Sequence, residues 1–453
     1  MRSRITRLWA LLFAAVLVVA ACSPAGTGAD TTESDTGGAD TTQAPEPTES
    51  PEPEDDTIRI GGLGPLSEPG TVNAGIDMQW AMELAVADIN AAGGVLGKQL
   101  ELFFEDTQNL PDVAAAVAKK LVEEVGVHAV VGEYHSGAAL GAIPTFNESG
   151  TPVVFSETWN DKITGGDPED PDNLPAQPPT VFRIAPTSTY ASNFAIDWLV
   201  NGIGASKVVQ VFEATDFGIG QNESLLALLE GTGIAVEAVQ VELNQPDYST
   251  VLTRLAEEHG DADVVIFDVT GDSSYVAEQN AIDVGLIDDD TICFANQVAQ
   301  NSDAFWAAVP DGVGCVFRFV GPAPSAYNDL TASVAERYRA EFGQEPAAWV
   351  FEAYDSVLLV ADAIERAGST DAAAIVAALE TTSFLGAQGQ YEFPYGSENT
   401  ATPADKPWLW HQWPQPAISM LQYTEAGQSV SDAAIVWPEA AQTHGTAYIP
   451  VDR

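Results

Sequence analysis

Short apolar runs alternate with segments of helical periodicity along most of this chain. Apolar runs at 58–63, 100–104 and 129–131 predict strands, and apolar residues at helical spacing between them, as in 76–92, predict helices. The same alternation returns over 207–295. Strands that alternate with helices favour an α/β fold with a parallel, doubly wound sheet. Because the order is repeated, we expect two similar lobes rather than one large sheet.

The last third of the chain has a less regular pattern. Apolar faces predict helices at 326–342 and 347–367. Proline and glycine then separate apolar runs that predict four strands, at 389–393, 408–413, 418–423 and 434–437. Earlier in the chain, five prolines among several acids interrupt the alternation of predicted strands and helices between 164 and 180. This composition predicts a surface loop.

Two polar clusters mark the candidate site. The apolar run 129–131 is followed by Glu-Tyr-His-Ser at 133–136, and the run 152–155 is followed by Ser-Glu-Thr-Trp at 156–159. A helix-like segment, 137–148, connects them. In an open parallel sheet both clusters lie at the carboxyl ends of neighbouring strands, where such sheets bind their ligands. The pattern favours a small-molecule receptor.

The charge and composition of the chain limit the classes of molecule that it can bind. The chain has 453 residues, 66 acidic against 17 basic, for a formal net charge of −49. Such a surface repels phosphate backbones, which argues against nucleic-acid binding. Only five histidines are present and they form no motif, so we expect neither a metal nor a cofactor.

The amino-terminal 56 residues indicate export. Residues 1–22 combine three arginines with an apolar run too short to span a membrane comfortably, and small residues precede Cys22 as in a lipoprotein signal. Residues 23–56 hold no aromatic residue, lysine or arginine, which predicts a disordered tether. We therefore expect an extracytoplasmic protein that meets the membrane only through a lipid on Cys22. An ordinary cleaved signal with an incidental cysteine is the alternative.

Two further cysteines, Cys293 and Cys315, follow Cys22. In an exported chain a leftover pair is most simply a disulfide, provided that the apolar runs carrying them are adjacent strands. Two buried free thiols are the alternative.

Several short sequence motifs in this chain resemble those of the leucine/isoleucine/valine-binding proteins, which are type I periplasmic binding proteins. They lie at 60–67, 131–136 and 347–353, and the most specific is DINAAGGVLGK at 88–98. The resemblance implies two Rossmann-like lobes joined by three crossovers that close on a ligand. It also implies delivery of that ligand to the permease subunits of an ABC importer.

The resemblance implies the domain boundaries as well. Lobe I is expected at 57–184 plus 320–390, lobe II at 185–319 plus 391–438, and a carboxyl-terminal tail at 439–453. The crossovers are expected near 183–186, 318–321 and 388–393.

The family's ligand-binding positions in lobe I fall on the two polar clusters. A serine after the third strand holds the ligand carboxylate in amino-acid binders, and Ser136 occupies that place, at a helix start suited to anions. Ser136 acting only as the helix cap is the alternative. The Glu157 backbone and Thr158 match the positions that bind the ligand ammonium. Tyr134 and Trp159 are candidates to stack on a ligand.

The remaining expected contacts come from the first crossover and lobe II. Thr187 and Ser188 follow the crossover, Phe217 matches an aromatic wall, and Thr270 follows the next sheet strand. Gln297 stands where amino-acid binders keep an acid for the ammonium. This departure leaves the ligand open among an amino acid, a neutral amide and a urea-like molecule.

Two other function classes remain as alternatives: a binding protein that feeds a signalling receptor, and an exported enzyme. The enzyme reading is disfavoured because the nucleophile elbow G-x-S-x-G and the zinc motif H-E-x-x-H are absent. His135 beside Ser136 and the acids Glu133 and Glu157 are the only candidates for catalysis that we weighed.

Overall fold

Two β-sheets carry the fold of this protein. The computed structural model describes residues 57–321 and 328–451. The expected signal segment, Cys22 and the tether lie outside these described residues. Each sheet, with its helices, forms one of the two expected lobes.

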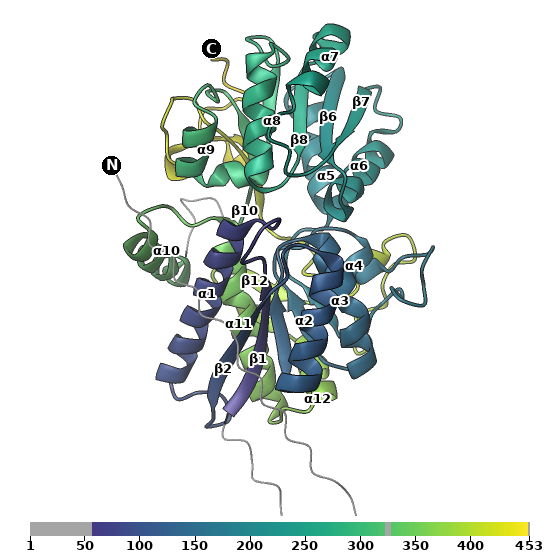
Figure 1. Ribbon diagram of the computed structural model, residues 1–453, viewed down its shortest axis with the longest axis vertical. Coiled ribbons are helices and arrows are strands. Elements are labelled where there is room, and N and C mark those ends of the chain that lie inside the picture. The colour runs from purple at the N-terminus through teal and green to yellow at the C-terminus, as the bar shows by residue number, and fades with distance from the viewer. Residues whose placement is uncertain (1–56, 322–327, 452–453) are drawn as a thin grey trace, which may run out of the picture. The chain divides into compact units, whose positions relative to one another are not determined.

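The lobe I sheet is entirely parallel, with the strand order β2-β1-β3-β4-β5. Its neighbouring strands β1 and β2 are labelled in Figure 1. Its strands are β1 Thr57–Gly64, β2 Gln99–Asp106, β3 Ala129–Gly132, β4 Val153–Phe155 and β5 Val181–Arg183. The central strands are apolar on both faces because helices cover both sides of the sheet.

Two pairs of helices cover the lobe I sheet. α1 (Val72–Ala91) packs with α11 (Ala348–Ala367) over one face, and α2 (Pro111–Lys119) packs with α3 (Ser136–Ser149) over the other. The remaining elements of this part are the π-helical η1 Lys120–Val125, α4 Lys162–Gly165, α10 Asp329–Phe342, α12 Ala372–Glu380 and the hairpin of β11 Ser383–Leu385 with β12 Gln390–Glu392.

The lobe II sheet has the order β14-β13-β10-β9-β8-β6-β7 and is parallel except at β13 and β14. Its strands are β6 Lys207–Glu213, β7 Ala235–Val241, β8 Val264–Asp268, β9 Ile292–Ala295, β10 Val316–Val320, β13 Ile418–Gln422 and β14 Ala434–Trp437. Its helices are α5 Ser188–Asp197, η2 Trp198–Gly202, α6 Asp216–Leu229, α7 Ser249–His259, α8 Gly271–Asp283, η3 Gln297–Gln300 and α9 Ser302–Ala308.

The third crossover differs from the expected one. Residues 391–413 stay with lobe I, because Arg183 at the end of β5 accepts a backbone hydrogen bond from Trp413 and donates one to His411, each at 3.0 Å. The return to lobe II therefore falls at 414–417 and not near 388–393. Residues 408–413 are no strand, since η5 (Pro407–Leu409) begins there.

Two smaller corrections concern the other boundaries. Val320 pairs with Ile418 inside the lobe II sheet, so lobe I resumes after residue 320. α5 directly follows the first crossover, where the sequence pattern predicted only a turn. Its start is fixed by Thr187, whose side chain accepts a hydrogen bond from the Tyr190 N–H at 2.9 Å.

The two remaining cysteines are bonded to each other. Cys293 in β9 and Cys315, one residue before β10, form a disulfide with their Cα atoms 4.7 Å apart. Both are fully buried. β9 and β10 are parallel neighbours, which brings the two thiols together.

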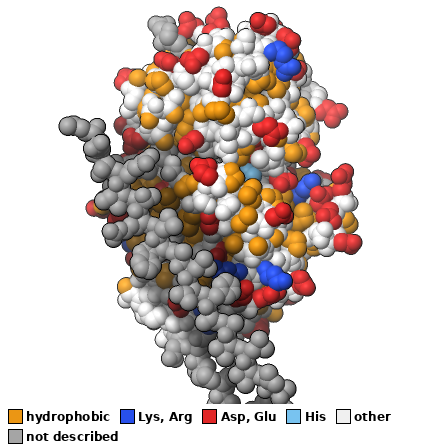
Figure 2. Space-filling model, viewed as in Figure 1, with side chains coloured by type: hydrophobic (Ala, Val, Ile, Leu, Met, Phe, Trp, Pro, Cys, Tyr) orange, Lys and Arg blue, Asp and Glu red, His pale blue; other side chains and the backbone are white. Residues whose placement is uncertain are grey.

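Acidic side chains are spread over the face seen in Figure 2, where basic side chains are few. Within residues 57–321 and 328–451, no helix is both long and apolar enough to cross a bilayer.

Candidate functional site

The turns that follow the strands of the two sheets contact each other across the lobes. Several side chains make hydrogen bonds from one lobe to the other: His135 to Glu213, Asn160 to the Asp216 carbonyl, Asn244 to the Pro69 carbonyl, Gln297 to Glu157, and Thr189 to Asp161. Three of these bonds come from the two polar clusters predicted from the sequence or from the residue that follows them. The clusters therefore lie at the boundary between the lobes.

The turn after β3 holds a buried acid in a strained backbone. Glu133 has a φ of 68°, which is unusual for a residue with a Cβ. Its Oε1 accepts hydrogen bonds from the N–H groups of Tyr134 and His135, at 3.0 and 2.9 Å. Burial raises the pKa of Glu133, and these bonds offset only part of that rise. The turn thereby fixes where the Tyr134 side chain points.

Ser136 connects the two polar clusters. Its Oγ accepts hydrogen bonds from the N–H groups of Trp159 and Asn160, both at 3.1 Å. The hydroxyl that was expected to hold a ligand carboxylate thus positions the turn after β4. The neighbouring His135 faces Glu213 with Nε2 and Oε1 3.2 Å apart, so the described structure gives no nucleophile–base pair between His135 and Ser136.

The start of α3 faces an acid of lobe II. A methyl group on Gly137 would lie 2.9 Å from Asp216 Oδ2. A helix amino terminus attracts negative charge, and here the protein's own carboxylate is next to it. A ligand carboxylate would have to compete with Asp216 for this position.

The turn after β4 supplies a second buried acid. Glu157 accepts a hydrogen bond from Gln297 of lobe II and faces Glu352 of α11. Glu157 is 2% exposed and Glu352 is fully buried. Burial raises the pKa of both groups, and repulsion from Glu157 raises that of Glu352 further. Two buried carboxyl groups in this position disfavour a state in which both are ionised.

Lobe II contributes two acids that already have basic or hydroxyl partners. The Arg318 guanidinium donates to Asp268 Oδ1 at 2.6 Å and to Gln221 Oε1 at 3.2 Å. Glu213 Oε2 accepts from both the N–H and the hydroxyl of Thr270, at 2.6 and 2.8 Å. Both carboxyl groups are therefore paired within the protein, whereas Arg318 Nε has no partner among the described residues.

Aromatic rings line the same region. Tyr134 packs edge-on against Trp349 with centroids 5.7 Å apart, and Trp159 packs edge-on against Phe217 at 6.1 Å. The Arg318 guanidinium lies 5.3 Å from the Trp159 ring centroid. These rings can pack against the apolar part of a ligand or against a cation.

The predicted site residues divide into two groups. The first group lies on the turns where the lobes meet or packs directly against them: Tyr134, Glu157, Thr158, Trp159, Phe217, Thr270 and Gln297. Thr187 caps α5, and Ser188 accepts a hydrogen bond from Gln221 at 3.0 Å. For those two residues the structure gives a role in positioning α5.

Sequence reasoning missed Glu352, Trp349 and Arg318. All three come from segments that were read as core, namely α11 and β10. The signal was present, because a glutamate in the middle of the apolar run AWVFEAY has to find a partner inside the protein.

Several buried polar atoms on these turns have no hydrogen-bond partner among the described residues. They include the oxygens Tyr134 Oη, Ser156 Oγ, Thr158 Oγ1 and Gln297 Oε1, the carboxyl oxygens Glu133 Oε2 and Glu157 Oε2, and the nitrogens His135 Nδ1 and Trp159 Nε1. Folded proteins pair nearly all such atoms with protein or water. Unsatisfied atoms on the turns after β3, β4 and β9 are what a polar ligand between the lobes would satisfy.

A cavity of about 220 Å³ opens beside this site. It is lined by both lobes: Gly70 and Thr71 come from the loop before α1, and Asn244, Thr270 and Asp272 come from lobe II. Because Thr270 also belongs to the Glu213 network, the cavity reaches the edge of the candidate site.

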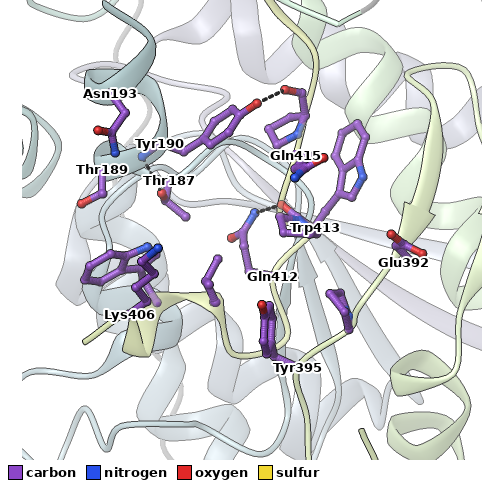
Figure 3. A pocket seen from close by; sticks show the side chains of 15 residues that line it. Thr187, Thr189, Tyr190, Asn193, Glu392, Tyr395, Lys406, Gln412, Trp413 and Gln415 are labelled. Atoms are coloured by element: carbon purple, nitrogen blue, oxygen red, sulfur yellow. Dashed lines mark hydrogen bonds between the residues drawn. The ribbon is translucent and has the colours of Figure 1, made fainter. Parts of the chain in front are cut away.

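Another pocket, of about 460 Å³, lies against the crossovers (Figure 3). Tyr190, Tyr395 and Trp413 form its aromatic walls. The Tyr190 hydroxyl already donates to the Pro416 carbonyl at 3.1 Å, and Gln412 Nε2 donates to the carbonyls of Ala185 and Trp413. These two side chains hold the crossovers. The buried polar atoms without a partner lie instead on the turns after the strands, and the candidate site is therefore placed there.

A metal-based function finds no support in the described structure. Over residues 57–321 and 328–451, no three histidine, cysteine or acidic side chains are grouped so that they could hold an ion.

Comparison with known proteins gives the family. The periplasmic binding protein model matches residues 57–405. The Leu/Ile/Val-binding protein homolog 3 of Brucella melitensis biotype 1 is 25% identical over 324 residues, covering 71% of this chain and 82% of that protein.

Two solved structures share the fold. The branched-chain amino acid substrate-binding protein LivJ of Streptococcus pneumoniae, in complex with isoleucine, has a TM-score of 0.67 at 23% identity and covers 83% of this chain and 97% of its own. A solute-binding protein of Rhodopseudomonas palustris, in complex with 3,4-dihydroxybenzoic acid, has a TM-score of 0.65 at 19% identity and covers 81% and 93%. With the family model matching well over half of its length, this chain belongs to the periplasmic binding protein family and has its type 1 fold.

Proposed function

We propose that this protein is the extracytoplasmic receptor of an ABC importer, which captures a small polar solute by closing its two lobes. The observation that carries the proposal is the group of buried, unpartnered polar atoms on the turns after β3, β4 and β9. A solute that bonds to these atoms contacts both lobes at once.

Closure follows from those contacts. Tyr134 and Thr158 belong to lobe I, and Gln297 belongs to lobe II, so a ligand bound to all three favours the arrangement in which the lobes meet. The protein needs no chemistry on the ligand. The rigid α/β scaffold holds the turns, and the three crossovers supply the hinge.

The relatives support this reading. The Streptococcus pneumoniae protein is a transporter component solved with isoleucine, and the Rhodopseudomonas palustris protein is an ABC transporter component solved with an aromatic acid. The same fold therefore serves chemically different solutes, and the ligand of this chain has to be inferred from its own site.

Thermal unfolding tests the receptor function directly. The protein is screened against amino acids, amides, urea, amines and small carboxylates, since a ligand that binds only the folded state raises the melting temperature. We expect at least one class to do so and to shrink the radius of gyration measured by X-ray scattering. If no solute raises the melting temperature, the proposal is wrong.

The membrane anchor is tested separately. We propose that Cys22 carries a lipid and that residues 23–56 link it to the lobes, in agreement with the composition of both segments. Replacing Cys22 by alanine should move the protein from the membrane fraction to the soluble fraction. Unchanged membrane retention of the C22A variant would refute the anchor and leave the receptor function untouched.

A further inference from the structure

The charges around the candidate site do not balance. Asp268 is paired with Arg318, and Glu213 is paired with His135. The hydrogen bond to Glu213 and its charge outweigh the effect of burial and raise the pKa of His135, which favours the charged imidazolium. Glu157 and Glu352 remain, buried and facing each other, without a basic side chain in the described contacts.

The positive charge that this pair lacks does not come from the protein. Gln297, which bonds to Glu157, is neutral, and its Oε1 faces no donor. Tyr134 Oη is likewise without a partner, although the ring is 95% buried against Trp349. Both unpartnered atoms are oxygens that can accept a hydrogen bond. A ligand group with several N–H donors would satisfy the acids and these oxygens together.

The position for a ligand carboxylate is occupied as well. Ser136 Oγ accepts hydrogen bonds from Trp159 and Asn160, and the carboxylate of Asp216 lies beside the start of α3. A zwitterionic amino acid would therefore bring its carboxylate next to Asp216. The site repels that group and attracts a cation.

We propose that the cleft binds a small organic cation whose ammonium or guanidinium group lies between the carboxyl groups of Glu157 and Glu352. This inference rests on the proposed receptor function and names its substrate class. The ring of Trp349 and the face of Tyr134 provide an apolar wall beside the cation, which suits the hydrocarbon part of an amine.

Binding of the cation should release a proton. Burial and repulsion from Glu157 raise the pKa of Glu352, and a cation bound beside it would lower that pKa and favour the ionised carboxylate. Asp355 on the same helix adds to the repulsion that raises the pKa of Glu352, and Glu213 and Asp272 of lobe II act on the neighbouring Tyr134 in the same sense. The nearby cation Arg318 is already paired with Asp268.

Calorimetry with a matched set of probes tests the proposal. The full-length protein is titrated with 1,4-diaminobutane, agmatine, 4-amino-1-butanol, 1,4-butanediol, succinate, leucine and isovaleramide. We expect only cationic probes to bind, and their apparent binding heat to vary with the ionisation heat of the buffer because a proton is released. The Glu352→Gln variant should bind the best cation more than tenfold more weakly and lose the proton release.

A control variant separates charge at the site from charge in general. Asp362 lies on the same helix, also has a carboxyl side chain, and pairs with Arg366 at the surface. Asp362→Asn should leave the affinity within twofold of the unchanged protein. If Asp362→Asn weakens binding as much as Glu352→Gln, the inference is wrong.

The outcomes also distinguish the inference from the function on which it rests. Tight binding of leucine, isovaleramide or succinate, without binding of any cationic probe, would refute the inferred cationic ligand and leave the proposed receptor function intact. Failure of every cationic probe to bind refutes the inferred cationic ligand in any case. Failure of every probe of every charge would overturn the receptor function too.

Discussion

Two buried polar clusters of this protein use similar residues and differ in how completely they are hydrogen-bonded. The crossover cluster consists of Arg183, Thr164, Glu380, His411 and Gln412. The cleft cluster consists of Tyr134, Glu157, Thr158, Gln297 and Glu352. Every residue in both clusters except Arg183 has a counterpart of the same broad type: an acid, an amide, a threonine or an aromatic ring.

The crossover cluster is closed. Arg183 donates to Gln412, to the Asn160 carbonyl at 2.6 Å and to Thr164 at 3.0 Å. His411 lies 2.7 Å from Glu380 and 3.1 Å from the Val181 carbonyl. In the cleft cluster, by contrast, Tyr134, Thr158 and Gln297 each keep an unpartnered oxygen. Complete pairing therefore distinguishes the cluster that holds the crossovers from the cluster proposed to bind the ligand.

The largest effect is expected at Arg183. Replacing it by methionine leaves the Asn160 carbonyl and Gln412 buried without their donor, and we expect a loss of about 3–5 kcal/mol in the free energy of unfolding. Arg183→Lys should recover only part of this, because one ammonium cannot reach all of these acceptors. Urea unfolding measures both variants. A loss below about 1 kcal/mol would mean that the crossover cluster does not hold the lobes in place.

A pH-dependent effect is expected at Glu278, which lies behind the cleft turn after β9. Its pKa is raised to about 8 by burial, although Ser274 and the Asn296 N–H donate to it. The folded protein therefore keeps a proton that the unfolded chain releases near pH 4.5, and stability falls between pH 4.5 and about 8.

The Glu278→Gln variant removes this dependence. Its stability relative to the unchanged protein should rise by about 1.4 kcal/mol per pH unit across that window, since one proton is involved. Urea unfolding at pH 4.5 and pH 8 provides the comparison, and the exposed Glu257→Gln serves as control. A difference that is the same at both pH values contradicts the assignment.

A smaller effect is expected at Ser136, which should contribute both to the stability of the turn after β4 and to the affinity for the ligand. Ser136→Ala leaves the buried N–H groups of Trp159 and Asn160 unpaired, which should lower the stability by about 1–3 kcal/mol. Affinity should fall as well, because the turn that carries Glu157 and Thr158 loses its tie to α3. Thermal unfolding and calorimetry report the two effects. Weaker binding at unchanged stability would instead place the hydroxyl directly on the ligand.

The smallest stability effect is expected at Tyr134. Tyr134→Phe removes an oxygen that has no partner and keeps the ring against Trp349, so the stability should stay constant or rise by up to about 1 kcal/mol. Affinity for the ligand should nevertheless fall about tenfold, since the ligand loses one hydrogen bond. A variant that is clearly destabilised would show that the hydroxyl is paired within the protein.

Much of the fold could be predicted from the sequence because it depends on local patterns. Val264–Asp268, Ile292–Ala295 and Ala434–Trp437 are strands with the expected bounds. Their continuous apolar runs, bounded by polar turns, leave little choice of conformation. The third crossover could not be predicted in this way, since the position of 391–413 depends on backbone pairing with Arg183, far away in the sequence.

The candidate site shows the same division. Strand ends place polar turns at one edge of a parallel sheet whatever the rest of the chain does, so Tyr134, Glu157 and Gln297 could be singled out from their positions. Their partners could not. Glu352 approaches Glu157 only because α11 packs over β3 and β4, and Ser136 turns its hydroxyl to Trp159 only because β3 and β4 are neighbours.

The sequence by itself thus determined the two α/β lobes, the family resemblance and the polar turns at the strand ends, because each of these depends on periodicity or on short motifs. Only the tertiary structure decided the charge of the site. An acid missing at residue 297 is supplied from a different helix, and a serine expected to meet the ligand is used to hold a turn. Charge balance and hydrogen-bond pairing depend on which residues are neighbours in space. Residues that are distant in the chain become such neighbours only when the protein folds.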